Sequence, residues 1–266
     1  MLIDTHCHLD APEFDTDRAT VIAQTLAAGV QAIVIPAVMQ KNQQIVRDLA
    51  HQFDGGYYAL GIHPMYVRYS KEEDLADVEL AIQTAQNAGD KKLVAMGEIG
   101  LDFFVEEIKT GLERERQEFF YKEQLKMARK YQLPVLLHVR RSQDILLKYL
   151  RQIKVCGGIA HAFNGSHQQA QAFIELGFCL GFGGTLTFTR SQQIRRLATE
   201  IDLQHIVLET DAPDLPPAWL REEKPRNSPA YLPEIAKVLA ELRGISFEAL
   251  VAATGENAKR VLPNLA

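Results

Sequence analysis

The 266-residue sequence predicts a (β/α)8 barrel of the TIM-barrel class, formed by a single domain over residues 1–266. Short apolar, β-branched runs alternate with longer amphipathic segments along the whole chain, which indicates successive strand–helix units around a parallel sheet. Eight such units can be counted, the number that closes a barrel. A doubly wound open sheet is the alternative, but the sequence lacks the Gly-x-Gly-x-x-Gly pattern after its first strand.

The predicted strands are short runs rich in Val, Ile, Leu and aromatic residues, as expected for strands that are buried on both faces. In chain order they are Leu2–Thr5, Gln31–Ile35, Tyr57–Gly61, Leu93–Gly97, Pro134–Leu137, Gly158–His161, Phe178–Gly181 and His205–Glu209.

The segments between these strands carry apolar residues at helical spacing with charged residues between them. The predicted helices are Thr16–Ala28, Lys41–Phe53, Lys71–Ala88, Gly111–Tyr131, Ser142–Ile153, Ser166–Leu176, Ser191–Ile201 and Ala230–Leu242. A last helix is predicted over Ser246–Val261, because a serine cap is followed two residues later by a glutamate. We expect this helix to close the bottom or the flank of the barrel.

Composition and charge exclude several classes of protein. Hydrophobic residues make up 47% and charged residues 24% of the chain, which excludes a disordered or fibrous protein. No apolar stretch supplies the roughly 18 uninterrupted residues of a membrane span, and the N-terminus does not have the pattern of a signal peptide. We therefore expect a cytoplasmic protein without a membrane partner. The three cysteines, Cys7, Cys156 and Cys179, are expected to be reduced, buried thiols.

The net charge of −5 gives no attraction of the whole molecule for nucleic acid. Any contact with nucleic acid would be local, around a metal or a small cluster of Arg and Lys. The sequence does not indicate an oligomeric state, and a monomer is the expectation.

Histidines and carboxylates gather at the ends of the predicted strands, where a barrel of this class has its active site. His6 and His8 are two residues apart, so in an extended chain both point to the barrel interior while Cys7 points away. Two imidazoles that converge in this way can share one metal. A histidine pair alone is equally compatible with metal binding and with hydrogen bonding inside a core.

Four further ionisable residues follow apolar strands in the same manner: Glu98, His138, His161 and Asp211. A buried charge at such a position is costly unless it is paired or binds an ion, so the complete set favours metal binding. Four imidazoles and two carboxylates suit Zn²⁺, Mn²⁺ or another borderline metal, whereas Mg²⁺ prefers more oxygen ligands. Six ligands exceed the need of one tetrahedral ion, so a site for two divalent cations that a carboxylate bridges is predicted.

Other polar residues near the strand ends are predicted to contact the substrate or to support the ligands. His63 at the third strand end is predicted to meet substrate, with capping of the strand as the alternative. Glu209 is predicted to orient a ligand without binding the metal itself. One of Arg140 and Arg141 can meet a phosphate, although solvated surface charge is an equal alternative. The remaining histidines are expected at the surface.

At these positions the sequence resembles the family of TatD-type deoxyribonucleases, which is similar to the barrel amidohydrolases. The resemblance extends almost from end to end and includes several ordered motifs. They are DTHCHLD at Asp4–Asp10, GIHP at Gly61–Pro64, GEIGLDF at Gly97–Phe103, LPVLLHVR at Leu133–Arg140, ETDAP at Glu209–Pro213 and RNSPAYLP at Arg226–Pro233.

The resemblance implies a metal-dependent phosphodiesterase with DNA or another phosphodiester as its partner. It assigns one cation to His6, His8, Glu98 and Asp211, and a second cation to Glu98, His138 and His161, with Glu98 as the bridge. It implies that Asp211 acts as general base toward the attacking water. It also places His63 near the substrate and Asn227 in a loop, Asn227–Leu232, that shapes the site. His63, Arg140 and Asn227 are therefore the predicted substrate-binding residues.

The sequence departs from the family pattern at two positions that are not predicted ligands. Met65 follows GIHP where the family often has histidine, and Ala162 stands where it often has cysteine. Two alternative functions are a hydrolase of small amides, lactones or esters, and a non-catalytic barrel that binds metal or nucleic acid. Related carbonyl hydrolases often have lysine at the fourth strand end, where this chain has Glu98, which favours the phosphodiesterase. The complete ligand set argues against a non-catalytic barrel.

Overall fold

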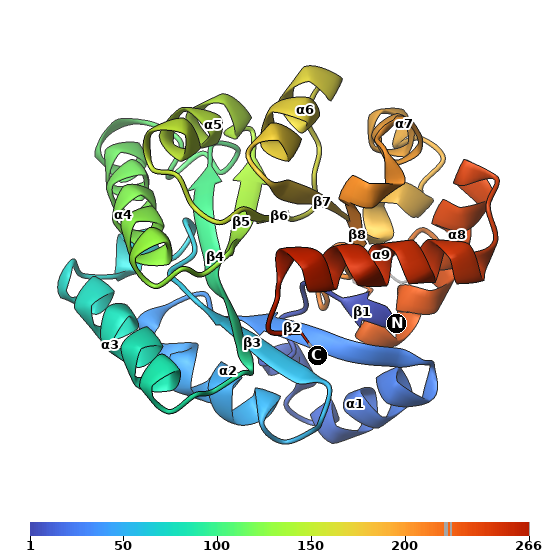
Figure 1. Cartoon of the computed structure of the whole chain (residues 1–266), viewed down its shortest axis with the longest axis horizontal. Coiled ribbons are helices and arrows are strands. Elements are labelled where there is room, and N and C mark those ends of the chain that lie inside the picture. The colour runs from blue at the N-terminus through green and yellow to red at the C-terminus, as the bar shows by residue number, and fades with distance from the viewer. Residues whose placement is uncertain (221–222, 224, 266) are drawn as a thin grey trace.

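The structure, a computed structural model, describes residues 1–220, 223 and 225–265. Eight parallel strands form one sheet in the order β1-β2-β3-β4-β5-β6-β7-β8. The ring closes where the backbone N–H of Thr5, just after β1, donates to the carbonyl oxygen of Leu208 in β8 at 3.1 Å. Helices surround this ring of strands (Figure 1). The predicted (β/α)8 barrel is confirmed.

The strands are β1 (Leu2–Asp4), β2 (Val30–Pro36), β3 (Gly56–Leu60), β4 (Leu93–Asp102), β5 (Val135–Arg140), β6 (Gly158–Ala160), β7 (Phe178–Phe182) and β8 (Ile206–Leu208). The α-helices are α1 (Arg18–Ala27), α2 (Gln43–Ala50), α3 (Glu73–Asn87), α4 (Gly111–Lys130), α5 (Gln143–Gln152), α6 (His167–Glu175), α7 (Gln192–Glu200), α8 (Leu232–Arg243) and α9 (Phe247–Val261). Short 3-10 helices in the loops are η1 (Pro12–Phe14), η2 (Gln40–Asn42), η3 (Val67–Tyr69), η4 (Gly184–Thr187), η5 (Leu203–His205) and η6 (Pro229–Tyr231).

Strand β4 differs most from its prediction, because it continues to Asp102 instead of ending at Gly97. The pairing with β5 shifts register between Met96 and Ile99 and then continues to the pair Asp102 and Arg140. The irregular pairing leaves Glu98 inside the strand rather than beyond its end. Strand β4 therefore carries two buried carboxylates, four residues apart.

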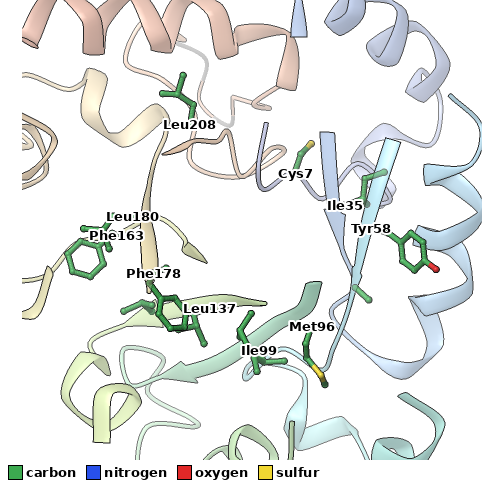
Figure 2. Packing of buried hydrophobic residues seen from close by; sticks show 14 of the residues in the cluster. Cys7, Ile35, Tyr58, Met96, Ile99, Leu137, Phe163, Phe178, Leu180 and Leu208 are labelled. Atoms are coloured by element: carbon green, nitrogen blue, oxygen red, sulfur yellow. The ribbon is translucent and has the colours of Figure 1, made fainter. Parts of the chain in front are cut away.

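Two layers of apolar side chains hold the barrel together. The larger layer lies between the strands and the surrounding helices, where Tyr58 and Phe163 are fully buried (Figure 2). The smaller layer fills the barrel interior with residues such as Val34, Leu136 and Val207. Burial on both faces explains why these strands are almost continuously apolar in sequence.

Helix α9 lies across the end of the barrel at which both termini are found (Figure 1). Its Val261 and the following Leu262 belong to the inner apolar layer. The side-chain amide of Asn257 donates to the carbonyl oxygen of Ile206 at the start of β8, at 2.8 Å. Asn264 donates in the same way to Leu93 at the start of β4, at 2.9 Å. The last helix therefore closes the end of the barrel at which the strands begin, and the opposite end stays available for a site.

The cysteine prediction is confirmed in part. The three thiols are free, and Cys7 and Cys179 are buried. Cys156 is exposed, so the expectation that it is buried is wrong: it lies in the loop that enters β6 rather than in the strand. In the described part of the chain no helix is both long enough and apolar enough to cross a membrane.

Candidate metal centre

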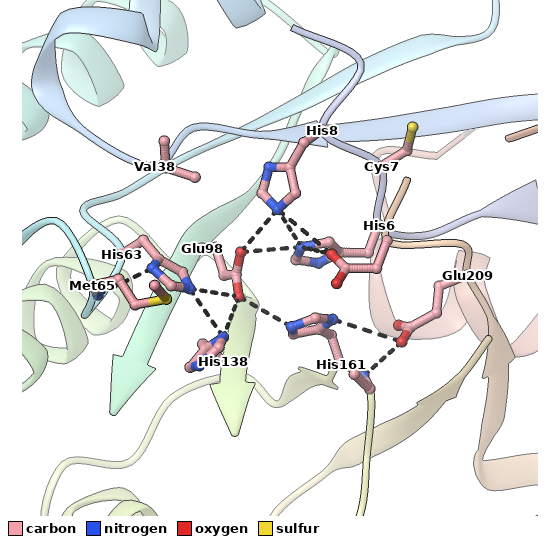
Figure 3. Close-up of polar contacts among 12 residues, drawn as sticks. His6, Cys7, His8, Val38, His63, Met65, Glu98, His138, His161 and Glu209 are labelled. Carbon is pink, nitrogen blue, oxygen red and sulfur yellow. Dashed lines mark hydrogen bonds and ion pairs between the residues drawn. The ribbon is translucent and has the colours of Figure 1, made fainter. Parts of the chain in front are cut away.

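Side chains from five strand ends meet at the carboxyl end of the barrel. His6 and His8 follow β1 and point to the centre of the ring, while Cys7 between them points away into the outer apolar layer (Figure 3). Glu98 enters from β4 and His138 from β5. His161 follows β6 directly and Asp211 follows β8 by three residues. The predicted ligands are thus brought together because parallel strands end on one side of the barrel.

The carboxylate of Glu98 lies between two groups of histidines (Figure 3). Its Oε2 atom is 3.1 Å from Nε2 of His6 and 3.4 Å from Nε2 of His8. Its Oε1 atom is 2.9 Å from Nδ1 of His138 and 3.1 Å from Nε2 of His161. Nε2 of His63 also lies 3.3 Å from Oε1. One carboxylate whose two oxygens face separate groups of nitrogens is the arrangement that a bridging ligand requires.

Asp211 completes the group around His6 and His8. Its Oδ1 atom is 3.6 Å from Nε2 of each histidine. The side chains of His6 and Glu98 are 0% and 1% exposed, whereas those of His8 and Asp211 are 17% and 13% exposed. Asp211 therefore lies on the side of the centre that water can reach.

The donor set fits divalent cations. Three overlapping groups have donor atoms that all lie within 4.8 Å of one another: His6, His161 and Asp211; His6, His8 and Glu98; and His63, Glu98 and His138. Imidazole nitrogens combined with carboxylate oxygens suit Zn²⁺, Mn²⁺ and similar ions. A metal requires neutral imidazole, with the proton on the nitrogen that faces away from it.

The partners of the outer ring nitrogens indicate which histidines can offer a lone pair to the centre. Nε2 of His138 lies 3.0 Å from Oδ2 of Asp102, so this nitrogen is the donor and Nδ1 is left to face Glu98. Nδ1 of His63 instead accepts the backbone N–H of Met65 at 3.1 Å. A neutral His63 therefore carries its proton on Nε2, which lies 2.9 Å from Nδ1 of His138 and 3.3 Å from Oε1 of Glu98. By this geometry His63 is a hydrogen-bond donor to the centre and does not act as a ligand.

Burial and charge set the protonation of the centre. Burial lowers the pKa of His6 to about 3 and that of His63 to about 4, so both rings are neutral. Burial also disfavours the charged form of His8, but the hydrogen bond and the charge of Glu98 outweigh it and raise its pKa to about 9. Burial raises the pKa of Asp211 to about 6. The positive charge of protonated imidazoles such as His8 thus balances the negative charge of the buried Glu98 carboxylate.

Comparison with known proteins identifies the family. The family model described as TatD related DNase matches residues 3–263. The chain belongs to the TatD family. It is 38% identical over 242 residues to YjjV of Escherichia coli K12, named an uncharacterized metal-dependent hydrolase, and the match covers 91% of this chain and 90% of that protein. A crystal structure of YjjV, described as a TatD homolog, superposes with a TM-score of 0.91 at 35% identity and covers 98% of both chains.

A human protein is also similar along almost its whole length. Deoxyribonuclease TATDN3 is 31% identical over 268 residues, and the match covers 99% of this chain and 95% of that protein. The resemblance that the ordered motifs indicated is therefore confirmed, as is the barrel fold that it implied.

The two residues that depart from the TatD pattern both contact the centre through their backbone. Met65 donates its N–H to His63, and Ala162 donates its N–H to Oε1 of Glu209 at 2.5 Å. Glu209 is buried, and the same Oε1 atom lies 3.6 Å from Nδ1 of His161. Glu209 therefore lies beside a predicted ligand, on the side away from Glu98, and its orienting role stays a prediction.

The structure places Arg140 and Asn227 in different surroundings. Arg140 is exposed at the end of β5, with Nη1 3.7 Å from Oδ2 of Asp102. Asn227 is fully buried, and its Nδ2 atom donates to the carbonyl oxygens of Thr210 and Asp214, both at 2.8 Å. Asn227 therefore holds the loop that carries Asp211, and a direct contact with substrate remains a prediction for both residues.

Sequence reasoning missed two buried aspartates of this TatD-family site. Asp102 orients His138, and its spacing of four residues from Glu98 in one strand was the signal that could have found it. Asp4 accepts the backbone N–H of Thr210 at 3.0 Å and the Thr210 hydroxyl at 2.6 Å, which ties β1 to the segment before Asp211. Burial raises the pKa of Asp4 to about 8. Its place in the DTHCHLD motif was noted, but without a role.

Proposed function

We propose that this metal-dependent hydrolase of the TatD family cleaves phosphodiester bonds, with DNA as its substrate, in a centre that holds two divalent cations. The observation that carries the proposal is the position of Glu98, whose Oε2 faces His6 and His8 while its Oε1 faces His138 and His161. The name of the human relative, a deoxyribonuclease, supports DNA as the substrate.

The proposed ligands divide into two sets that share Glu98. His6, His8, Glu98 and Asp211 hold one cation, and Glu98, His138 and His161 hold the other. Two divalent cations in such a centre supply Lewis acidity for a phosphoryl oxygen and make bound water more acidic. Zn²⁺ and Mn²⁺ suit these ligands better than Mg²⁺ does.

The protein side chains supply the proton transfer and the positioning. Asp211 lies on the accessible side of the centre, 3.6 Å from both His6 and His8, where it takes the proton of the attacking water. His63 holds its Nε2–H beside Nδ1 of His138 and Oε1 of Glu98, and with substrate bound it donates this N–H to a phosphoryl oxygen. Asp102 and Glu209 keep the ring orientations of His138 and His161.

The test combines metal analysis with an activity assay. Protein purified without chelator is analysed for bound metal and assayed with Mn²⁺, Zn²⁺ or Mg²⁺ on a labelled oligonucleotide and on a generic phosphodiester. Asp211→Asn should lower kcat by about 10²- to 10⁴-fold, the usual contribution of a general base. The control Asp77→Asn changes the same charge at an exposed position of α3 and should retain full activity.

Metal-dependent cleavage that Asp211→Asn abolishes would support the proposal. If the protein binds metal and leaves every phosphodiester intact, the proposal is wrong, and assays on amides, lactones and esters come next. Unchanged activity of Asp211→Asn would refute the role of Asp211 alone.

A further inference from the structure

Two arginines that follow His138 in sequence lie against one exposed aromatic ring at the mouth of the barrel. The guanidinium carbon of Arg140 is 4.0 Å, and that of Arg141 4.6 Å, from the centroid of the Phe104 ring. Phe104 is 44% exposed although it is a large apolar residue. We call Phe104, Arg140 and Arg141 the rim clamp.

A buried carboxylate connects the rim clamp to the metal centre. Oδ1 of Asp102 accepts the backbone N–H of Phe104 at 2.8 Å and that of Val105 at 3.0 Å. Its Oδ2 atom lies 3.0 Å from Nε2 of His138 and 3.7 Å from Nη1 of Arg140. Phe104 and Arg140 therefore lie beside a proposed ligand, next to the same carboxylate that contacts His138.

The positive charge of the rim clamp is poorly neutralised within the protein. Among the residues that the structure describes, Arg141 forms no ion pair, and Arg140 has only Asp102, which His138 and two backbone N–H groups already engage. Two guanidinium groups held on one ring repel each other. Their proximity is energetically costly unless an anion binds between them. The whole chain has a net charge of −5, so the rim clamp is a local concentration of positive charge on an acidic protein.

The backbone of Arg141 adds an independent observation. Its φ angle is 56°, in the left-handed region that residues other than glycine rarely adopt. Backbone strain of this kind is typical of residues that a functional site holds in place. The turn after β5 thus directs a second guanidinium toward Phe104 at a conformational cost.

We propose that the rim clamp binds the phosphate next to the cleaved phosphodiester of a polynucleotide. This inference rests on the proposed function and deepens it. The guanidinium fork matches phosphate oxygens in geometry and charge, and the Phe104 ring keeps both forks oriented at the mouth. A small phosphodiester has no second phosphate and gains nothing from the rim clamp. The rim clamp therefore makes the site selective for a polymeric substrate.

The experiment compares two substrates that differ in the second phosphate. One is tetrathymidylate, and the other is the p-nitrophenyl ester of thymidine 5′-monophosphate, which has a single phosphodiester. The variants are Arg140→Ala, Arg141→Asn and Phe104→Leu, with asparagine chosen because it tolerates a positive φ angle. The control Arg151→Ala removes an exposed arginine at the far end of α5.

Each arginine variant should raise KM for tetrathymidylate about tenfold, as expected for the loss of one hydrogen bond to a charged group. The slope of log KM against log salt concentration should fall by about 0.7 for each arginine. Phe104→Leu should also raise KM for tetrathymidylate, but by a smaller factor than the arginine variants. In all three variants, KM for the p-nitrophenyl ester and kcat for both substrates should stay unchanged. The control Arg151→Ala should have the KM and kcat of the unaltered protein on both substrates.

The proposed role of the rim clamp would be overturned if the variants raised KM equally for both substrates. It would also be overturned if Arg151→Ala raised KM for tetrathymidylate as much as they do. A second measurement separates this failure from failure of the proposed function: fluorescence anisotropy of labelled tetrathymidylate with metal-loaded protein needs no turnover. If the arginine variants weaken binding about tenfold while no phosphodiester is cleaved, the rim clamp stands and the proposed function is wrong. If the protein cleaves DNA and the variants bind as tightly as the unaltered protein, only the rim clamp is wrong.

Discussion

Gly181 in β7 lies directly against Glu209, so its replacement by alanine should disturb the metal centre without changing any proposed ligand. A Cβ atom on Gly181 would lie 2.0 Å from Oε2 and 2.6 Å from Cδ of Glu209. Cβ contacts under 3.0 Å essentially do not occur in proteins, so the carboxylate has to move by about 1 Å. Glu209 is 1% exposed and has no solvent to move into.

The size of the effect follows from what this movement breaks. Oε1 of Glu209 accepts the N–H of Ala162 at 2.5 Å, and a charged hydrogen bond of this kind contributes about 1.5–3 kcal/mol. Overpacking of a buried site costs about 1–3 kcal/mol by itself. We expect the free energy of unfolding of Gly181→Ala to fall by about 3 kcal/mol. Displacement of the Glu209 carboxylate from its place 3.6 Å from Nδ1 of His161 should also weaken metal binding, by about 10- to 100-fold if Glu209 orients this ring.

Denaturant unfolding of the metal-free protein and competition with a chelator of known affinity measure the two effects separately. The double variant Gly181→Ala with Glu209→Asp shortens the crowded side chain by one carbon and should recover part of the metal affinity. The control Gly55→Ala crowds the carbonyl oxygen of Gln31, at 2.3 Å, before β3 and away from the centre. It should lower stability and leave metal affinity unchanged. If Gly181→Ala behaves in the same way as this control, Glu209 does not orient His161.

Four further variants test single contacts of the centre. Glu98→Gln removes the charge that both histidine groups share, so elemental analysis should find less than one cation per chain. His63→Asn should keep the full cation content, because the N–H of Met65 occupies Nδ1, but should raise KM for the phosphodiester; loss of a cation would make His63 a ligand. Asp102→Asn should weaken binding of one cation by about 10- to 100-fold in chelator competition. Unchanged affinity would show that the Asp102 carboxylate does not orient His138. Asn227→Ala leaves buried carbonyl groups unpaired and should lower the free energy of unfolding by about 2–3 kcal/mol, measured with denaturant, at unchanged KM; a raised KM at unchanged stability would indicate substrate contact instead.

The sequence by itself determined the barrel and the residues at its mouth. Strands buried on both faces must be apolar throughout, so a charged residue directly after such a run, as at His138 or His161, stands out against its surroundings. The spacing of His6 and His8 was sufficient to predict their common direction, because side chains in an extended chain alternate between two faces. These are local properties of the chain, and they survive in the folded protein.

The tertiary structure decided how these residues are related to one another. Asp102 reaches His138 only because β4 continues after its register shift and pairs with β5 up to Arg140. The division of the histidines between the two oxygens of Glu98 depends on strands that are separated by up to 92 residues in sequence.

Two further roles depend on contacts that no sequence pattern marks. His63 is made a donor by a backbone N–H two residues away, and Asn227 is buried although its motif had indicated a contact with substrate. Hydrogen-bond direction, burial and the distance between charges are properties of the packed barrel. Local sequence supplied the chemical groups of this site, whereas long-range strand pairing assigned their roles.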